Sequence, residues 1–137
     1  MDSFMGWIGG KRILRKAILE RFPKDKVERY IEVFGGAAWV LFAKEKQAGQ
    51  LEVYNDINGD LVNLFRCVKY HCGELQREFD WLLSSREQFF DYVAQANMRG
   101  LTDIQRAARF FYVVKLSFGS EHRTYGTSKK MVDNAVE

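Results

Sequence analysis

Two hydrophobic patterns alternate along the chain, one typical of short strands and the other of helices. Residues 30–34 form a β-branched and aromatic run that stops at two glycines, and a second such run begins at residue 53 and leads into an acidic residue. Residues 37–48, between these runs, are apolar and helix-favouring. The pattern therefore predicts a strand, a glycine loop, a helix and a second strand.

The rest of the chain predicts helices. Apolar residues recur three and four apart in residues 13–22 and 61–68. Ser84-Ser85-Arg86-Glu87 and Thr102-Asp103-Ile104-Gln105 both have the capping-box form, so a helix is predicted to begin at each. Because these helical faces form cores, we interpret residues 110–112 as packing residues rather than as a platform for stacked bases.

The glycine loop and the acidic residue form a candidate nucleotide site. Gly35 and Gly36 let the backbone approach a ligand where a Cβ would collide. Asp56 follows them at about the 20-residue spacing at which an acidic residue accepts hydrogen bonds from a ribose diol. Two other readings stay open: that the residues from 55 to 58 only cap the next helix, and that the unit binds a dinucleotide, although no G-x-G-x-x-G occurs.

With the preceding Gly6-Trp7-Ile8-Gly9-Gly10-Lys11, these segments resemble the Dam-type family of DNA adenine-N6 methyltransferases over nearly the whole chain. The resemblance implies an α/β fold: a truncated Rossmann-like S-adenosylmethionine-dependent methyltransferase domain, followed by a helical segment. We expect residues 1–72 to be the amino-terminal part of the donor-binding domain. We expect residues 73–137 to be the mostly helical start of the DNA-recognition subdomain.

The resemblance also implies a pocket for S-adenosylmethionine, with no metal, in which Trp7 and Lys11 line the donor and Asp56 holds its ribose. The family pattern Glu-Pro-Phe-x-Gly-x-Gly stands here as Glu32-Val33-Phe34-Gly35-Gly36-Ala37-Ala38, without the proline and with shifted glycines. The predicted cofactor-binding residues are Trp7, Ile8, Lys11, Glu32, Phe34, Gly35, Gly36, Asp56 and Ile57.

Glu32 is an acidic residue inside an otherwise apolar strand, where burial is costly unless the carboxylate is paired. One interpretation makes it a partner for the donor's charged methionine end, through Lys11 or water. The other places it at an edge position that faces solvent.

The family's chemistry uses an Asn/Asp/Ser-Pro-Pro-aromatic loop that holds the target amino group of an extruded adenine. The sequence has one proline, Pro23, so it contains no such loop and we predict no catalytic residue. We expect an amino-terminal fragment of a site-specific DNA adenine-N6 methyltransferase, inactive alone, that self-associates through the open edge of its sheet. The alternative is a non-catalytic DNA-binding remnant or subunit of such an enzyme.

A net charge of +3 is too small to establish a nucleic-acid partner, but the distribution of charge is more informative. A basic, glycine-punctuated segment with aromatics follows the last predicted helix, and it can supply phosphate partners and a ring for double-stranded DNA. The predicted DNA contacts are Lys115, Phe118, Arg123 and Lys129, of which Arg123 matches an arginine of the family. The alternative is a disordered tail.

Several other kinds of site are disfavoured. Cys67, His71 and Cys72 would need a distant fourth ligand, and no C-x-x-C pair is present, so these thiols are interpreted as structural or incidental. No signal peptide or apolar run of about 20 residues occurs, which indicates no membrane partner and a reducing cytoplasm. The resemblance to the Dam-type family implies a bacterial or phage origin.

Overall fold

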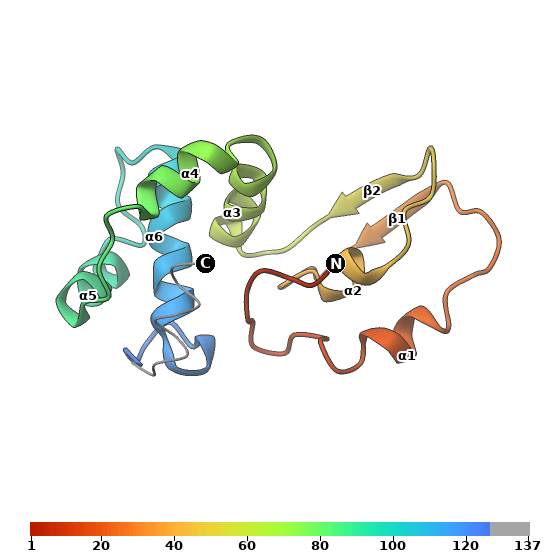
Figure 1. The fold of residues 1–137 in the computed structure, drawn as a ribbon, viewed down its shortest axis with the longest axis horizontal. Coiled ribbons are helices and arrows are strands. Elements are labelled where there is room, and N and C mark those ends of the chain that lie inside the picture. The colour runs from red at the N-terminus through yellow and green to blue at the C-terminus, as the bar shows by residue number, and fades with distance from the viewer. Residues whose placement is uncertain (127–137) are drawn as a thin grey trace. The chain divides into compact units, whose positions relative to one another are not determined.

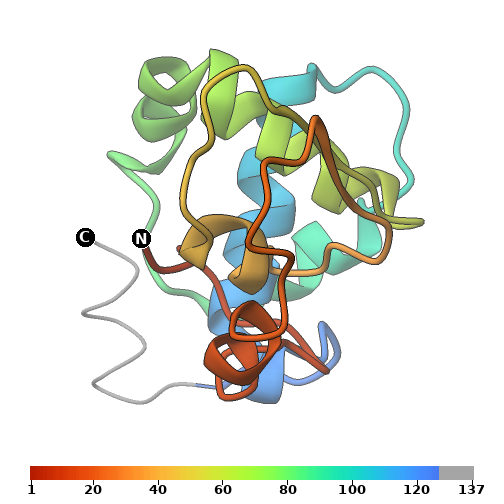
Figure 2. The ribbon, with the colours of Figure 1, turned by 90° about the vertical axis from the view of Figure 1, so that its right-hand side faces the viewer.

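The structure, a computed structural model, describes residues 1–126, and its contacts divide the chain into one compact unit from Met1 to Ile57 and a second that begins at Asn58 (Figures 1 and 2). We predicted the domain boundary after residue 72. The compact units divide earlier, after Ile57, and the predicted domain boundary stays a prediction.

The first unit is a small parallel sheet with two short helices. Its elements are α1 (Arg15–Leu19), β1 (Arg29–Glu32), α2 (Trp39–Ala43) and β2 (Leu51–Tyr54). The strands pair in parallel, with Arg29 opposite Leu51 and Glu32 opposite Tyr54. Parallel neighbours need a crossover connection, and α2 lies in it. The predicted order of strand, loop, helix and strand is confirmed, although α2 is shorter than the apolar run from which it was predicted.

The second unit is helical. Its elements are α3 (Gly59–Tyr70), α4 (Cys72–Phe79), α5 (Arg86–Ala94), α6 (Asp103–Leu116) and a short 3-10 helix, η1 (Phe118–Ser120). The helices α3, α4 and α5 all pack against α6, which is the longest of them (Figures 1 and 2). Among residues 1–126, no helix is both long enough and apolar enough to cross a bilayer.

The capping motifs decide where two of these helices begin. Thr102 caps α6 with the predicted box: its hydroxyl accepts from the Gln105 N–H at 3.1 Å, and the Gln105 side chain accepts from the Thr102 N–H at 3.1 Å. For α5 the predicted cap was wrong by one residue, because Ser85 accepts from the Gln88 N–H while the Ser84 hydroxyl contacts the Tyr125 hydroxyl at 2.9 Å.

The position of Tyr112 in α6 tests the prediction that this residue packs in the core. Tyr112 is buried, and its hydroxyl donates to the carbonyl of Leu83 at 2.8 Å. It joins Phe89, Val113 and Leu116 in one hydrophobic cluster. Tyr112 is therefore a packing residue, as its place in an apolar helical pattern predicts.

Candidate functional site

The three sequence segments that predicted a donor site come together at Gly36. Its N–H donates to the Asp56 carboxylate at 2.9 Å, and its carbonyl accepts from the Tyr54 hydroxyl at 2.7 Å. The Trp7 ring lies against it, since a Cβ added at Gly36 would be 3.0 Å from Trp7 Cδ1. Residues far apart in sequence thus surround one peptide unit beyond the ends of two parallel strands, where open α/β sheets place ligands.

Gly35 is required by the packing beside it. A Cβ at this buried position would lie 2.1 Å from Tyr54 Cε2, far inside the contact distance of two carbons. Gly36, the next residue, has a φ of +49°, in the left-handed region that glycine adopts at little cost. The two glycines therefore serve different needs: the first makes room for a ring, and the second permits the turn that aims its N–H at Asp56.

Backbone and amide bonds fix Asp56 opposite this turn. The Asn55 N–H donates to the Glu32 carbonyl at 2.9 Å, and the Asn55 side-chain amide donates to the Val33 carbonyl at 2.8 Å. The helix-cap interpretation of residues 55–58 is confirmed for Asn58, which caps α3 by accepting the Asp60 and Leu61 N–H groups at 3.1 and 3.0 Å. The Asp56 carboxylate instead faces the glycine loop.

The segment around Trp7 folds as a tight turn. The Gly10 N–H donates to the Trp7 carbonyl at 2.9 Å, and a Cβ at Gly10 would lie 3.2 Å from Nε1 of Trp39. The exposed Lys11 side chain donates back to the Gly9 carbonyl at 2.6 Å. The turn thus packs against α2 through Trp39 and holds the Lys11 ammonium beside it.

Three of the predicted pocket residues have apolar side chains that are exposed rather than packed in a core. Ile8 is 62% exposed, Phe34 90% and Ile57 101%. Large apolar side chains this exposed, next to a backbone turn that glycine holds open, are typical of a surface that a partly apolar ligand covers.

Glu32 is held by two hydrogen bonds. Its carboxylate accepts the Leu41 N–H of α2 at 3.1 Å and the Tyr30 hydroxyl at 3.3 Å. Burial raises its pKa above the ordinary value, while these two hydrogen bonds act in the opposite direction. The prediction of a solvent-facing edge position is wrong, because the side chain is half-buried and ties β1 to α2.

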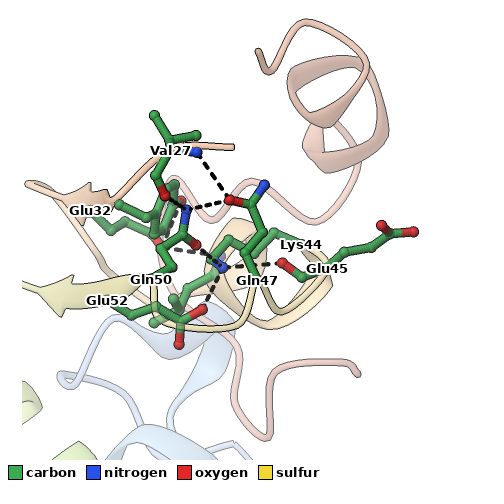
Figure 3. A network of polar contacts seen from close by, with 9 residues as sticks. Val27, Glu32, Lys44, Glu45, Gln47, Gln50 and Glu52 are labelled. Carbon is green, nitrogen blue, oxygen red and sulfur yellow. Dashed lines mark hydrogen bonds and ion pairs between the residues drawn. The ribbon is translucent and has the colours of Figure 1, made fainter. Parts of the chain in front are cut away.

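A polar network next to Glu32 fixes the connection between α2 and β2 (Figure 3). Lys44 forms an ion pair with Glu52 and donates to the Gln50 amide oxygen at 2.7 Å. The Gln50 amide donates in turn to the Val27 carbonyl at 2.9 Å, just before β1. Since the Lys44 ammonium is taken up by these contacts, the network holds the register of the two strands and with it the opposition of Gly36 and Asp56.

Three of the predicted DNA-contact residues, Lys115, Phe118 and Arg123, lie at the end of α6 and in the 117–125 loop that follows it. An antiparallel bridge between Ser117 and Tyr125 closes this loop, which leaves Phe118 70% exposed and Arg123 exposed. The Lys115 ammonium lies over the Phe111 ring at 5.2 Å, and burial lowers its pKa. Lys129 lies outside the described residues.

Two site residues were missed by sequence reasoning. Tyr54 fills the space beside Gly35 and bonds the Gly36 carbonyl, and Trp39 backs the Trp7 turn. The only local signal was an aromatic residue directly before Asn55-Asp56. Within residues 1–126, no three His, Cys, Asp or Glu side chains gather as a set of metal ligands.

Known proteins that are similar to this chain are methyltransferases. The family model for the D12 class N6 adenine-specific DNA methyltransferase matches residues 7–129. The chain is 28% identical to the type II methyltransferase M.MjaIII of Methanocaldococcus jannaschii, over 90% of this chain and 48% of that protein. It is 29% identical to the type II methyltransferase M1.LlaDCHI of Lactococcus lactis subsp. cremoris, over 90% of this chain and 44% of that protein. The chain spans about half the length of these curated relatives.

Proposed function

Because the chain belongs to the D12 class family of N6 adenine-specific DNA methyltransferases, we propose that its first unit is the S-adenosylmethionine-binding part of such an enzyme. The observation that carries the proposal is the meeting of Trp7, Gly36 and Asp56 beyond the ends of parallel strands. The arrangement of β1, α2 and β2 supports a Rossmann-like domain. Bound S-adenosylmethionine would supply the methyl group for transfer to adenine N6.

The roles of the residues follow from their chemistry. The Asp56 carboxylate accepts the ribose hydroxyls, and the Gly36 turn lets the donor approach the backbone. Ile8, Phe34 and Ile57 cover the apolar parts of the donor. The 137 residues contain one proline and so no Pro-Pro loop, and we propose that turnover needs a segment outside them.

Calorimetric titration of S-adenosylmethionine into the 137-residue chain tests the donor site. The parent is expected to bind saturably, and Asp56→Ala to lose about 10- to 100-fold in affinity, since hydrogen bonds to a charged group contribute roughly 1.5–3 kcal/mol. Asp25→Ala, which removes an exposed carboxylate outside the site, is the matched control and should bind like the parent. If the folded parent fails to bind, or the Asp56 variant binds unchanged, the proposed site is wrong.

The same titration examines Glu32, which we propose interacts with the donor's methionine end. Glu32→Gln keeps an oxygen that can accept the Leu41 N–H, so the fold should persist. A weaker affinity with an unchanged melting curve is the expected result. An unchanged affinity would mean that Glu32 joins β1 to α2 and does not interact with the donor.

For the second unit we propose contact with double-stranded DNA through the 117–125 loop and its neighbours. Phe118 and Arg123 are the exposed ring and cation of the loop, and Lys115 and Lys129 flank it in sequence. Arginine supplies phosphate or base-edge contacts, and an exposed ring can wedge between base steps.

We further propose that the chain self-associates through its two-stranded sheet. Ile31 in β1 is 55% exposed, Leu51 in β2 is 56% exposed, and Val33, directly after β1, is 51% exposed, so apolar residues in and next to the strands are left on the surface of the first unit. Exposed apolar strands with unpaired edges favour association. Light scattering should give a mass above that of one chain and rising with concentration, and a monomeric mass at high concentration would contradict this.

A further inference from the structure

The second unit contains a pocket of about 240 Å³ between the start of α3, the helices α5 and α6, and the loop after η1. Its lining includes Asn58, Tyr92, Arg106, Arg109, Phe110 and His122. Its volume is below the roughly 300–1,000 Å³ of pockets that enclose a whole drug-sized ligand. The pocket therefore fits one group of a molecule rather than all of S-adenosylmethionine.

The two arginines in the lining differ in their partners. Arg106 is neutralised, because its guanidinium lies 3.3 Å from the Asp60 carboxylate and 3.7 Å from that of Asp103. Arg109 donates to the neutral amide oxygen of Gln95 and lies 5.2 Å from the centre of the Tyr92 ring. Throughout residues 1–126 no carboxylate forms an ion pair with Arg109, and Asp60, which also lines the pocket, is paired with Arg106.

The other polar groups of the pocket define what it can accept. The start of α3 is not the anion site, because the Asn58 side chain already accepts the N–H groups of Asp60 and Leu61. His122 is held in the pocket wall by edge contact with the Phe110 ring, at 5.4 Å between centres, and has a φ of +60°, which is costly for a residue other than glycine. Burial lowers the pKa of His122, so its ring is neutral at neutral pH and can donate one N–H.

We propose that this pocket binds a phosphate group, with the Arg109 guanidinium as its charged partner and the His122 ring as a second donor. A guanidinium presents parallel N–H groups that match two phosphate oxygens, and Arg109 has five donors of which Gln95 takes one. The phosphate could come from a DNA backbone or from a free nucleotide. The inference concerns the second unit and does not depend on donor binding by the first.

The test follows the backbone amides of Gln95 and Arg109 by NMR while inorganic phosphate is titrated into the full chain. Saturable shifts are expected, with Arg109→Gln weakening the affinity about tenfold or more, because a charge-assisted bidentate contact is lost. Arg77→Gln, which removes an exposed arginine of α4 outside the pocket, is the matched control and should bind like the parent. Should Arg109→Gln unfold, Arg109→Lys keeps the charge but loses the planar fork, and is expected to bind several-fold more weakly.

Two further titrations identify the source of the phosphate. A short DNA duplex that shifts the same amides, and that inorganic phosphate displaces, would identify the DNA backbone. Shifts of these amides with adenosine monophosphate, but not with the duplex, would identify a free nucleotide as the source. The proposal is overturned if the folded parent shows no shift at these amides with phosphate, or if Arg109→Gln and Arg109→Lys both bind phosphate like the parent.

Discussion

Alanine at Gly35 is expected to destabilise the protein by roughly 1–3 kcal/mol and to remove S-adenosylmethionine binding, as overpacking of a close-packed site does. The added Cβ would lie 2.1 Å from Cε2 and 2.8 Å from Cζ of Tyr54. The Tyr54 ring cannot turn aside without breaking the bond from its hydroxyl to the Gly36 carbonyl, at 2.7 Å. Relief of the clash therefore displaces the peptide that aims its N–H at Asp56.

Denaturant unfolding and calorimetry measure the two effects separately. Gly59→Ala is the matched control, because a Cβ there meets nothing within 4 Å, and its stability and donor affinity should stay close to those of the parent. A double-mutant cycle isolates the clash: Gly35→Ala should cost less when Tyr54 is already alanine. If Gly35→Ala costs the same with and without the Tyr54 ring, steric conflict is not the cause.

The features that sequence predicted well are those encoded by close neighbours. The strand, glycine loop and second strand follow from runs of a few residues, and the Thr102 capping box from four adjacent ones. The meeting of Trp7, Gly36 and Asp56 was implied by family resemblance, since periodicity alone places no segment against another. The structure then supplied the contacts that hold them together.

The features that sequence did not predict depend on tertiary contacts. Ser84 and Ser85 are equally good caps in sequence, and the choice follows from the Ser84 contact with Tyr125, 41 residues away. The partners of Glu32, a neighbouring tyrosine and the backbone of α2, were not predicted, and its interaction with the donor stays a prediction. Arg109 was not predicted as a site residue, because its lack of an ion pair within residues 1–126 is a property of the packed helices and not of the residues beside it in sequence.

Truncating Phe89 to alanine is expected to have the largest effect on stability, a loss of about 3–5 kcal/mol, as for other fully buried aromatic residues. Phe89 is 0% exposed and packs in the cluster with Tyr112, Val113 and Leu116. Its ring also lies 5.5 Å from that of Tyr125, which closes the 117–125 loop. The variant should therefore weaken the proposed DNA binding as well as unfold at lower denaturant concentration.

The adjacent Phe90 provides the matched control, since it lies on the same helix and is 44% exposed. Phe90→Ala removes the same atoms but leaves a smaller cavity, so it should cost about 1 kcal/mol or less. Chemical denaturation followed by circular dichroism gives both values, and a duplex titration at fixed salt gives the effect on the loop. Equal losses of stability at the two positions would mean that Phe89 is not the centre of this core. An unchanged DNA affinity in a folded Phe89→Ala protein would mean that the 117–125 loop does not contribute to DNA binding.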